Sequence, residues 1–204
     1  MLPPIKEYIE HRISEFSEIQ EERRMLLRKA AEYVAGRIRA GQPADLIYIC
    51  THNSRRSHFG QIWAAVAAHY YNIRPVRTWS GGTEATAFHP NAIGALRRAG
   101  FDISPESAGS NPVYQVRYDL ECDPLLCFSK IYNDPGNPKH TFAAVMTCSE
   151  AENNCPLIPG ADVRIALTYN DPKVADHTPQ EASTYDARCK QIAREALWLF
   201  SQIS

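Results

Sequence analysis

Cys50 and Arg56, with five residues between them, form a pair that suits chemistry on an oxyanion. The apolar run Leu46-Ile-Tyr-Ile-Cys50 predicts a strand of a parallel sheet, and the sequence from Ser57 onward predicts a helix. In a loop between a strand and a helix, backbone N–H groups can bind an anion, and the helix N-terminus adds its dipole. The planar fork of Arg56 matches two oxygens of a tetrahedral oxyanion. The segment therefore predicts an oxyanion-binding site.

Cys50 is the expected nucleophile of this site. The helix N-terminus and Arg56 create a positive field that favours the thiolate form of a cysteine, and the Ser57 hydroxyl can donate to that thiolate. Without this arrangement, the pair would be a buried cysteine at a strand end and an unrelated surface arginine. The residues expected to surround the oxyanion together with Arg56 are Thr51, His52, Asn53, Ser54, Arg55 and Ser57.

Strands and helices alternate along most of the chain, which predicts a doubly wound parallel sheet with helices on both faces. With four strands and a ligand at the carboxyl end of the first strand, this is the flavodoxin-like arrangement. The expected strands are 46–50, 75–80, 142–147 and 163–168, and the expected helices are 4–40, 57–71, 90–99 and 178–203.

Two parts of the chain fall outside this alternation. Residues 1–43 are expected to form an N-terminal helical extension, and residues 44–204 the α/β domain. Within that domain, the segments Tyr114–Tyr118 and Leu126–Ile131 alternate between polar and apolar residues, which predicts a β-hairpin in an insertion over about 108–140. The extension and the insertion are expected to form a lid or an oligomer contact.

Composition excludes several classes of protein. The chain has 204 residues, of which 44% are hydrophobic and 22% charged, so it is expected to fold rather than to be disordered. A formal net charge of −1 gives no electrostatic reason to expect nucleic acid or a membrane as a partner. The longest apolar run, Ile62–Ala68, is too short to span a membrane, and no signal peptide is evident, so we expect a cytoplasmic protein.

The loop from Cys50 to Ser57 resembles the phosphate-binding loop of low-molecular-weight protein tyrosine phosphatases and of their relatives, the thioredoxin-coupled arsenate reductases. The resemblance covers about residues 46–204 apart from the insertion, and it implies the flavodoxin-like fold and thiolate chemistry on an oxyanion. It continues through the segments Trp79–Glu84, His89–Ile93, Phe101–Ser104, Met146–Pro156 and Tyr169–Pro172.

The resemblance also implies a general acid. Both reactions of the family expel a poor leaving group, which a carboxylic acid must protonate. In the family this acid belongs to an Asp-Pro pair after the fourth strand, which corresponds to Asp171-Pro172. The same tripeptide, Asn-Asp-Pro, occurs at 133–135, where we expect an ordinary turn.

Cys148 and Cys155 bear on the choice between the two reactions. The segment between them resembles the redox segment of the arsenate reductases, down to Asn-Asn-Cys-Pro. In one straight helix the two thiols would lie about 10 Å apart along the axis. A disulfide needs Cα atoms within about 7 Å, so their pairing would require the segment to unwind. The alternative is two unrelated thiols. Cys122, Cys127 and Cys189 match no cysteine of the family and are expected to serve packing.

Two residues depart from the family pattern. Arg55 stands where the family often has an uncharged residue, and it is expected to add positive charge at the mouth of the site. Gln61 stands where some reductases place an acidic residue that helps to hold potassium, so no metal ligand is expected.

Three functions remain open from the sequence. The leading interpretation is an arsenate reductase for arsenic detoxification. It would use a Cys50/Cys148/Cys155 disulfide cascade, no bound cofactor, and an external dithiol reductant such as thioredoxin. The second interpretation is a phosphatase that hydrolyses phosphotyrosine through a phosphocysteine at Cys50. The third is a non-enzymatic regulatory module that binds an oxyanion, although such a module needs neither a nucleophile nor an acid.

Overall fold

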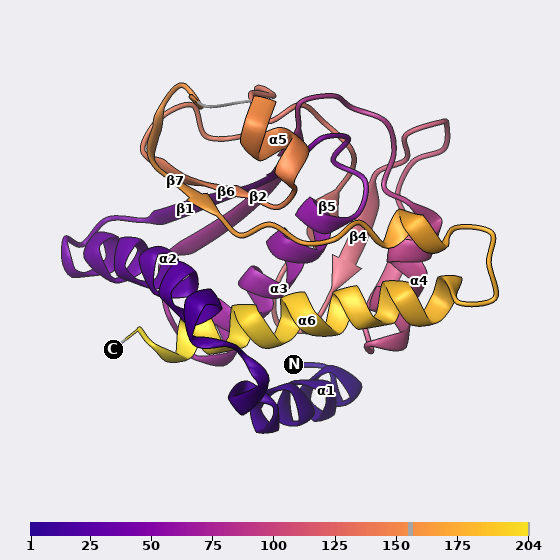
Figure 1. The fold of residues 1–204 in the computed structure, drawn as a ribbon, viewed down its shortest axis with the longest axis horizontal. Coiled ribbons are helices and arrows are strands. Elements are labelled where there is room, and N and C mark those ends of the chain that lie inside the picture. The colour runs from indigo at the N-terminus through magenta and orange to yellow at the C-terminus, as the bar shows by residue number, and fades with distance from the viewer. Residues whose placement is uncertain (155–156, 204) are drawn as a thin grey trace.

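In a computed structural model, which describes residues 1–154 and 157–203, the centre of the protein is a four-stranded parallel sheet (Figure 1). Its strand order is β2-β1-β6-β7, so the first strand in the chain lies inside the sheet. This is the flavodoxin-like order, and it confirms the predicted fold class. The strands are β1 (Ala44–Cys50), β2 (Val76–Gly82), β6 (Phe142–Met146) and β7 (Ala161–Ala166).

Helices cover the two faces of the sheet unequally. Helices α3 (Arg56–Tyr70) and α6 (Glu181–Ser201) lie on one face, with α4 (Pro90–Arg98) packed against α6 (Figure 1). Among the helices of the described residues, the short α5 (Ser149–Asn154) is the one that contacts the strands from the other face. Alternate residues of β1 point to opposite faces, so Leu46 joins the larger core and Ile47 the smaller one. Burial on both faces explains why β1 is a continuous apolar run.

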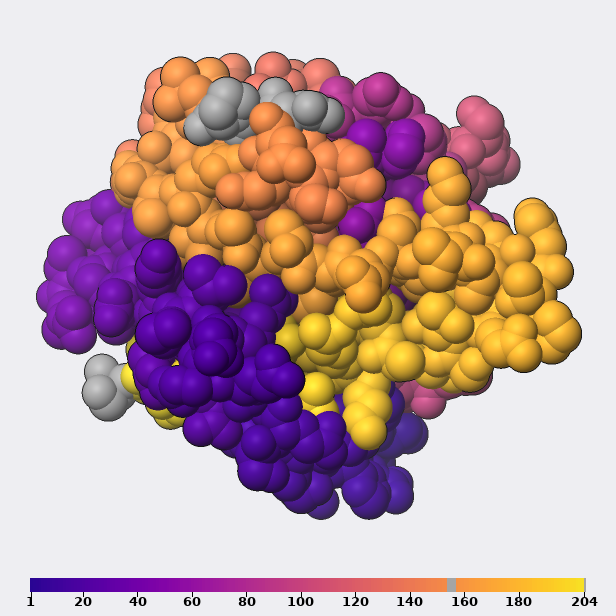
Figure 2. Space-filling model, viewed as in Figure 1, coloured from indigo at the N-terminus to yellow at the C-terminus, as the bar shows by residue number. Residues whose placement is uncertain are grey.

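The N-terminal helical region differs from the single helix predicted over residues 4–40. It consists of α1 (Pro3–Ser14), a 3-10 turn η1 (Phe16–Glu18) and α2 (Glu21–Arg39). A straight helix of that length would extend about 55 Å, far beyond the roughly 30 Å of α6. The break lets both helices bury apolar residues against the domain. Figure 2 shows these indigo helices lying directly against the yellow helix α6.

A buried ion pair fastens α2 to α6. Arg23 Nε donates to Glu195 Oε2 at 2.8 Å, and Glu195 is only 3% exposed. The hydroxyl of Tyr169 donates to the same oxygen at 2.9 Å, and the Arg23 guanidinium lies 4.5 Å from the centre of the Tyr169 ring. Tyr169 stands two residues before Asp171, so the N-terminal region supports the segment that follows β7.

The insertion forms a second, antiparallel sheet. Strand β4 (Tyr114–Arg117) pairs with β5 (Leu125–Cys127), which confirms the predicted hairpin. A third strand that the sequence pattern did not indicate, β3 (Asp102–Pro105), pairs with the other edge of β4. After β5 the chain returns to the main sheet, where Ile131 forms a parallel bridge with Gly82. Among the residues described, no helix combines the length and the apolar character needed to cross a membrane.

The Arg23–Glu195 pair should contribute strongly to stability. Replacing Arg23 with Met leaves a carboxylate buried without its cation, so the free energy of unfolding should fall by roughly 3–5 kcal/mol. The double variant Arg23→Met/Glu195→Gln removes both charges and should recover most of that loss. Urea denaturation measures all three proteins.

Arg28→Met is the matched control on the same helix, because the Arg28–Glu21 pair is exposed and should contribute within about 1 kcal/mol. An Arg23→Met protein as stable as the Arg28→Met control would show that Glu195 does not depend on its cation.

Candidate active site

The ends of three parallel strands meet where Cys50 lies. In the register of the sheet, Cys50 is opposite Gly82 of β2, and Ile49 is opposite Met146 of β6. The chain leaves β6 through Thr147 directly to Cys148. Because carboxyl ends of parallel strands share one edge of a sheet, the loops after β1, β6 and β7 converge there.

The loop after β1 is held in a tight curve by Asn53. This residue is fully buried and adopts a φ of 45°, a left-handed conformation that asparagine tolerates better than most residues. Its Oδ1 accepts from the N–H of Lys130 at 2.8 Å, and its Nδ2 donates to Ser57 Oγ at 2.8 Å. The loop also packs closely on Gly82, where a Cβ atom would lie 2.5 Å from Thr51 O. Only glycine permits that approach.

These hydrogen bonds orient the Ser57 hydroxyl beside Cys50, the expected nucleophile. Because Asn53 donates to Ser57 Oγ, the Ser57 hydroxyl keeps its own proton for another acceptor. Cys50 Sγ lies 3.1 Å from Ser57 Oγ, so the sulfur is within hydrogen-bonding distance of this hydroxyl. Cys50 is 3% exposed, at the bottom of the loop.

Arg56 is the first residue of α3 and connects two loops. Its Nη1 donates to Tyr169 O at 2.9 Å, and its Nη2 donates to Asp171 Oδ2 at 2.5 Å. Within residues 1–154 and 157–203, no group accepts from its buried Nε. That N–H remains for an oxyanion. An anion that binds Arg56 would compete with Asp171 and free its carboxyl group to protonate a leaving group.

Asp171 rather than Asp134 lies at this site. Asp171 begins the 3-10 turn η2 (Pro172–Ala175), and its Oδ1 accepts from Lys173 N at 3.0 Å. Asp134 instead accepts from Gly136 N at 2.8 Å, which is the turn expected for the first Asn-Asp-Pro.

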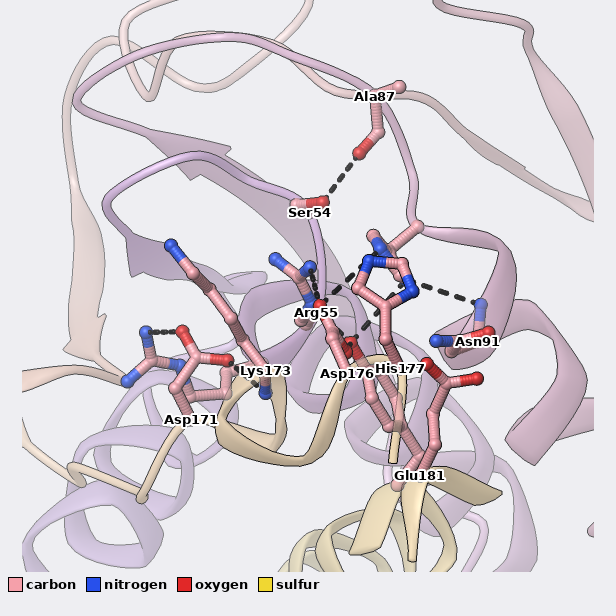
Figure 3. A network of polar contacts seen from close by, with 12 residues as sticks. Ser54, Arg55, Ala87, Asn91, Asp171, Lys173, Asp176, His177 and Glu181 are labelled. Carbon is pink, nitrogen blue, oxygen red and sulfur yellow. Dashed lines mark hydrogen bonds and ion pairs between the residues drawn. The ribbon is translucent and has the colours of Figure 1, made fainter. Parts of the chain in front are cut away.

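Arg55 does not add free positive charge at the mouth, contrary to the expectation from sequence. Figure 3 shows its side chain bound in a polar network that joins the loop after β1 to the segment after Asp171. Arg55 Nη2 pairs with Asp176 Oδ2 at 3.0 Å, and its Nε donates to Tyr185 OH at 2.6 Å. Tyr185 OH in turn donates to Asp176 Oδ1 at 2.7 Å. Asp176 thus neutralises Arg55.

His89 completes the network beside Arg55. Its ring stacks on Tyr185, and its Nδ1 accepts from Asn91 N at 3.3 Å, so it caps α4. Burial, and then the nearby charge of Arg55, lower the pKa of His89. A neutral ring suits the acceptor role at the cap.

Cys148 lies next to the loop after β1. Its Sγ is 3.5 Å from Thr51 Oγ1 and 3.4 Å from Ala151 N, and the residue is completely buried. Burial raises the pKa of the Cys148 thiol, while the contacts with Thr51 and Ala151 oppose that rise. The raised pKa favours the protonated thiol of Cys148. This thiol contacts Thr51, which directly follows Cys50 in the chain. Cys155 lies outside the described residues.

Two predicted loop residues direct their side chains away from the anion position. The His52 side chain is 44% exposed and lies 3.5 Å from Glu84 Oε2. Ser54 Oγ donates to Ala87 O at 2.7 Å (Figure 3). Both residues contribute to the loop through their backbone. In the part of the chain that the structure describes, no three His, Cys, Asp or Glu side chains are grouped to hold a metal ion.

Several supporting residues escaped the sequence analysis because no spacing links them to the loop. Lys130 positions Asn53, and Tyr169 accepts from Arg56, yet both are distant in sequence. Asp176 and Tyr185 hold Arg55 from a turn and a helix that carry no motif.

Comparisons with known proteins identify sequences similar to this chain. The chain is 25% identical over 158 residues to an arsenate reductase of Bacillus licheniformis, which covers 77% of this chain and 94% of that protein. It is 26% identical over 157 residues to an arsenate reductase of Bacillus subtilis, covering 77% and 94% of the two chains. No protein-family model matches the chain.

The fold has solved counterparts as well. The crystal structure of a low-molecular-weight phosphotyrosine phosphatase from Vibrio cholerae O395 matches 78% of this chain and 95% of that one, with a TM-score of 0.53 at 13% identity. The chain therefore shares the fold of this low-molecular-weight phosphatase, and its sequence is similar to those of arsenate reductases. Both of these Bacillus relatives are described as arsenate reductases.

Substitutions at the adjacent residues Arg55 and Arg56 should change different kinetic constants. Arg56→Lys keeps a charge but loses the fork, so kcat/KM should fall by roughly 10²–10³-fold, as for other lost oxyanion donors. Arg55→Ala should lower mainly kcat, by about tenfold, because it loosens the segment that carries Asp171. Steady-state kinetics with an aryl phosphate separates the two effects.

Asp176→Ala is the partner control for Arg55. If the two act as one clamp, the double variant Arg55→Ala/Asp176→Ala should be no slower than either single variant. Additive losses, or equal losses at Arg55 and Arg56, would contradict the separate roles of the arginines.

Asp171→Asn should reduce the rate by roughly 10²–10⁴-fold, the usual contribution of a general acid. Asp134→Asn is the matched control in the same tripeptide and should change the rate less than about twofold, since Asp134 only closes a turn. Single-turnover kinetics with an aryl phosphate provides the measurement. A larger effect at Asp134 would reverse the assignment.

Proposed function

We propose that this chain is an arsenate reductase that uses Cys50, Cys148 and Cys155 in turn. The observation that carries the proposal is the 3.5 Å contact between Thr51 Oγ1 and Cys148 Sγ, which puts a second thiol beside the nucleophilic loop. Hydrolysis of a phosphate ester has no use for that thiol. Similarity in sequence to the arsenate reductases of two Bacillus species supports the same choice.

The first step is attack on arsenate. The Cys50 thiolate, stabilised by Ser57, attacks the arsenic atom and displaces one oxygen as water. Arg56 and the loop N–H groups hold the remaining oxygens, and the Asp171 carboxyl group supplies the proton for the departing hydroxide. The product is a covalent Cys50–arsenic(V) intermediate.

The second step moves two electrons to arsenic. Cys148 loses its proton and attacks Cys50 Sγ, and the S–As bond breaks with its electron pair remaining on arsenic. Arsenite leaves, and a Cys50–Cys148 disulfide remains. The hydrogen bonds from Thr51 and Ala151 favour the Cys148 thiolate needed here. Cys155 then attacks Cys148, which frees the Cys50 thiolate and creates a Cys148–Cys155 disulfide.

An external dithiol of the thioredoxin type would reduce that last disulfide, and no bound cofactor is needed. Forming the Cys148–Cys155 disulfide requires this segment to unwind, because the two thiols would lie about 10 Å apart in a straight helix. Unwinding would also expose the disulfide to the reductant. The cytoplasmic location, the boundary near residue 43 and an oligomer contact through the N-terminal helices stay predictions.

Hydrolysis of phosphotyrosine is the second candidate. It is favoured by the shared fold with the Vibrio cholerae phosphatase and needs only Cys50, Arg56 and Asp171. In that reaction Cys50 forms a phosphocysteine, which water cleaves. A non-enzymatic oxyanion-binding module is the weakest candidate, since it gives no role to the nucleophile or the acid.

The Cys155→Ser variant separates the two enzymes. Multi-turnover reduction of arsenate with thioredoxin should stop, because the Cys50–Cys148 disulfide lacks a resolving thiol. Aryl phosphate hydrolysis should persist within a few-fold, since it consumes no electrons. Mass spectrometry after one turnover should detect the trapped Cys50–Cys148 disulfide.

Cys122→Ser is the control, as this thiol lies in the insertion and should not affect either reaction. Cys50→Ser should abolish both reactions. If Cys155→Ser reduces arsenate like the wild type, or if arsenate yields no disulfide, the reductase proposal is wrong.

A further inference from the structure

A second cavity lies at the outer edge of β2, and it has no residue in common with the loop 50–57. Its volume is about 620 Å³, within the range of roughly 300–1,000 Å³ that is typical of small-molecule sites. The cavity is bounded by β2, by the second half of α3 and by the insertion around β5. It plays no part in the chemistry proposed above.

The walls of this cavity are apolar and partly aromatic. Trp79, Tyr118 and Phe128 present rings to it, and Ala65 and Leu125 provide smaller apolar surfaces. Flat aromatic molecules gain most from such walls, because rings add stacking to the burial of area. The shape and lining therefore favour a ligand with an aromatic body.

The polar lining includes a buried cation. Lys130 is 7% exposed, and burial lowers the pKa of its ammonium, while Cys127 and Asp134 nearby oppose that shift. Its Nζ lies 4.5 Å from the centre of the Phe128 ring. Asp134 also lines the cavity, but its Oδ1 accepts from Gly136 N. An ammonium that has lost much of its solvation and forms no direct ion pair would be stabilised by an anionic group in the cavity.

Two more buried polar atoms on this cavity lack partners. Gln61 is 4% exposed and Thr78 is 9% exposed. The amide nitrogen of Gln61 donates to Thr78 O, but the described residues offer no partner to Gln61 Oε1 or to Thr78 Oγ1. The Thr78 hydroxyl can donate to a carboxylate, whereas Gln61 Oε1 can only accept. Together with Lys130, they fit a ligand that has both an anionic group and a hydroxyl or N–H donor.

The other charges at the rim do not alter this requirement. Arg77 is paired with Asp45 at 2.6 Å, and His69 lies 2.7 Å from Asp119. Arg74 is exposed and adds a further positive charge to the rim. The net charge that an occupant meets is therefore positive.

We propose that this cavity binds an aromatic carboxylate, with the carboxylate on Lys130 and Thr78 and a hydroxyl or N–H donor of the ligand on Gln61. The site is independent of the proposed reaction. It shares Lys130 with the active site, but through different atoms: the backbone N–H of Lys130 holds Asn53, and the side chain faces the cavity.

Binding of 3-hydroxy-2-naphthoate, measured by titration calorimetry, tests the proposal. Inorganic phosphate in excess occupies the oxyanion loop, so the titration reports the second cavity alone. The wild type should bind 3-hydroxy-2-naphthoate. Its affinity for 2-naphthol, which lacks the carboxylate, should be at least tenfold lower. Lys130→Met should weaken binding of the carboxylate by about tenfold or more, as expected for a lost charge-assisted hydrogen bond. Binding of 2-naphthol should hardly change.

Lys29→Met, on the exposed face of α2, is the matched control and should leave both affinities unchanged. Ala65→Phe, which fills the cavity, should abolish binding of both compounds. The proposal is wrong if phosphate competes with the probe, if Lys130→Met binds it like the wild type, or if 2-naphthol binds equally well.

Thermal unfolding without ligand gives a separate readout. Because Lys130→Met removes a partly desolvated ammonium that forms no direct ion pair, its melting temperature should be higher than that of the wild type, whereas Lys29→Met should match it. A lower melting temperature for Lys130→Met would show that the protein itself already satisfies this charge, and it would overturn the site.

Discussion

Arg56 is the group through which the two halves of the active site meet. Its guanidinium reaches from the start of α3 to Tyr169 O and to the Asp171 carboxylate, so it links the loop after β1 to the loop after β7. A guanidinium can do this because its donors lie in one plane at fixed angles. Because Asp171 neutralises Arg56, an oxyanion that binds both Nη groups must replace this carboxylate.

The remainder of the structure holds this guanidinium and its partners in place. Tyr169 is anchored by Glu195, which α2 reaches through Arg23. On the other side of the loop, Asn53 is bound by the backbone of Lys130 in the returning insertion. The N-terminal helices and the insertion therefore act as supports of the site through hydrogen bonds, including the contact of Ser129 Oγ with His52 O. Such contacts are strong because few waters compete with them.

Both arginines of the loop are paired with a carboxylate, Arg56 with Asp171 and Arg55 with Asp176. Arg56 keeps an N–H for the substrate, whereas Arg55 is held by Asp176 and Tyr185. The pairing limits the positive field to the position next to Cys50, and it also ties the general-acid segment to the loop. Cys148, a neutral buried thiol beside Thr51, adds no competing charge before it reacts.

Local sequence was enough to predict the parts of the protein whose determinants are contiguous. The strand at Leu46–Cys50, the loop with Arg56, the parallel order of the sheet and the hairpin of the insertion all follow from periodicity and short motifs. Tertiary structure alone decided the break between α1 and α2, the pairing of Arg55 with Asp176 and the cavity beside Lys130. These features depend on contacts between residues far apart in the chain. Because a side chain's charge, burial and partner are set by what packs against it, no local pattern encodes them.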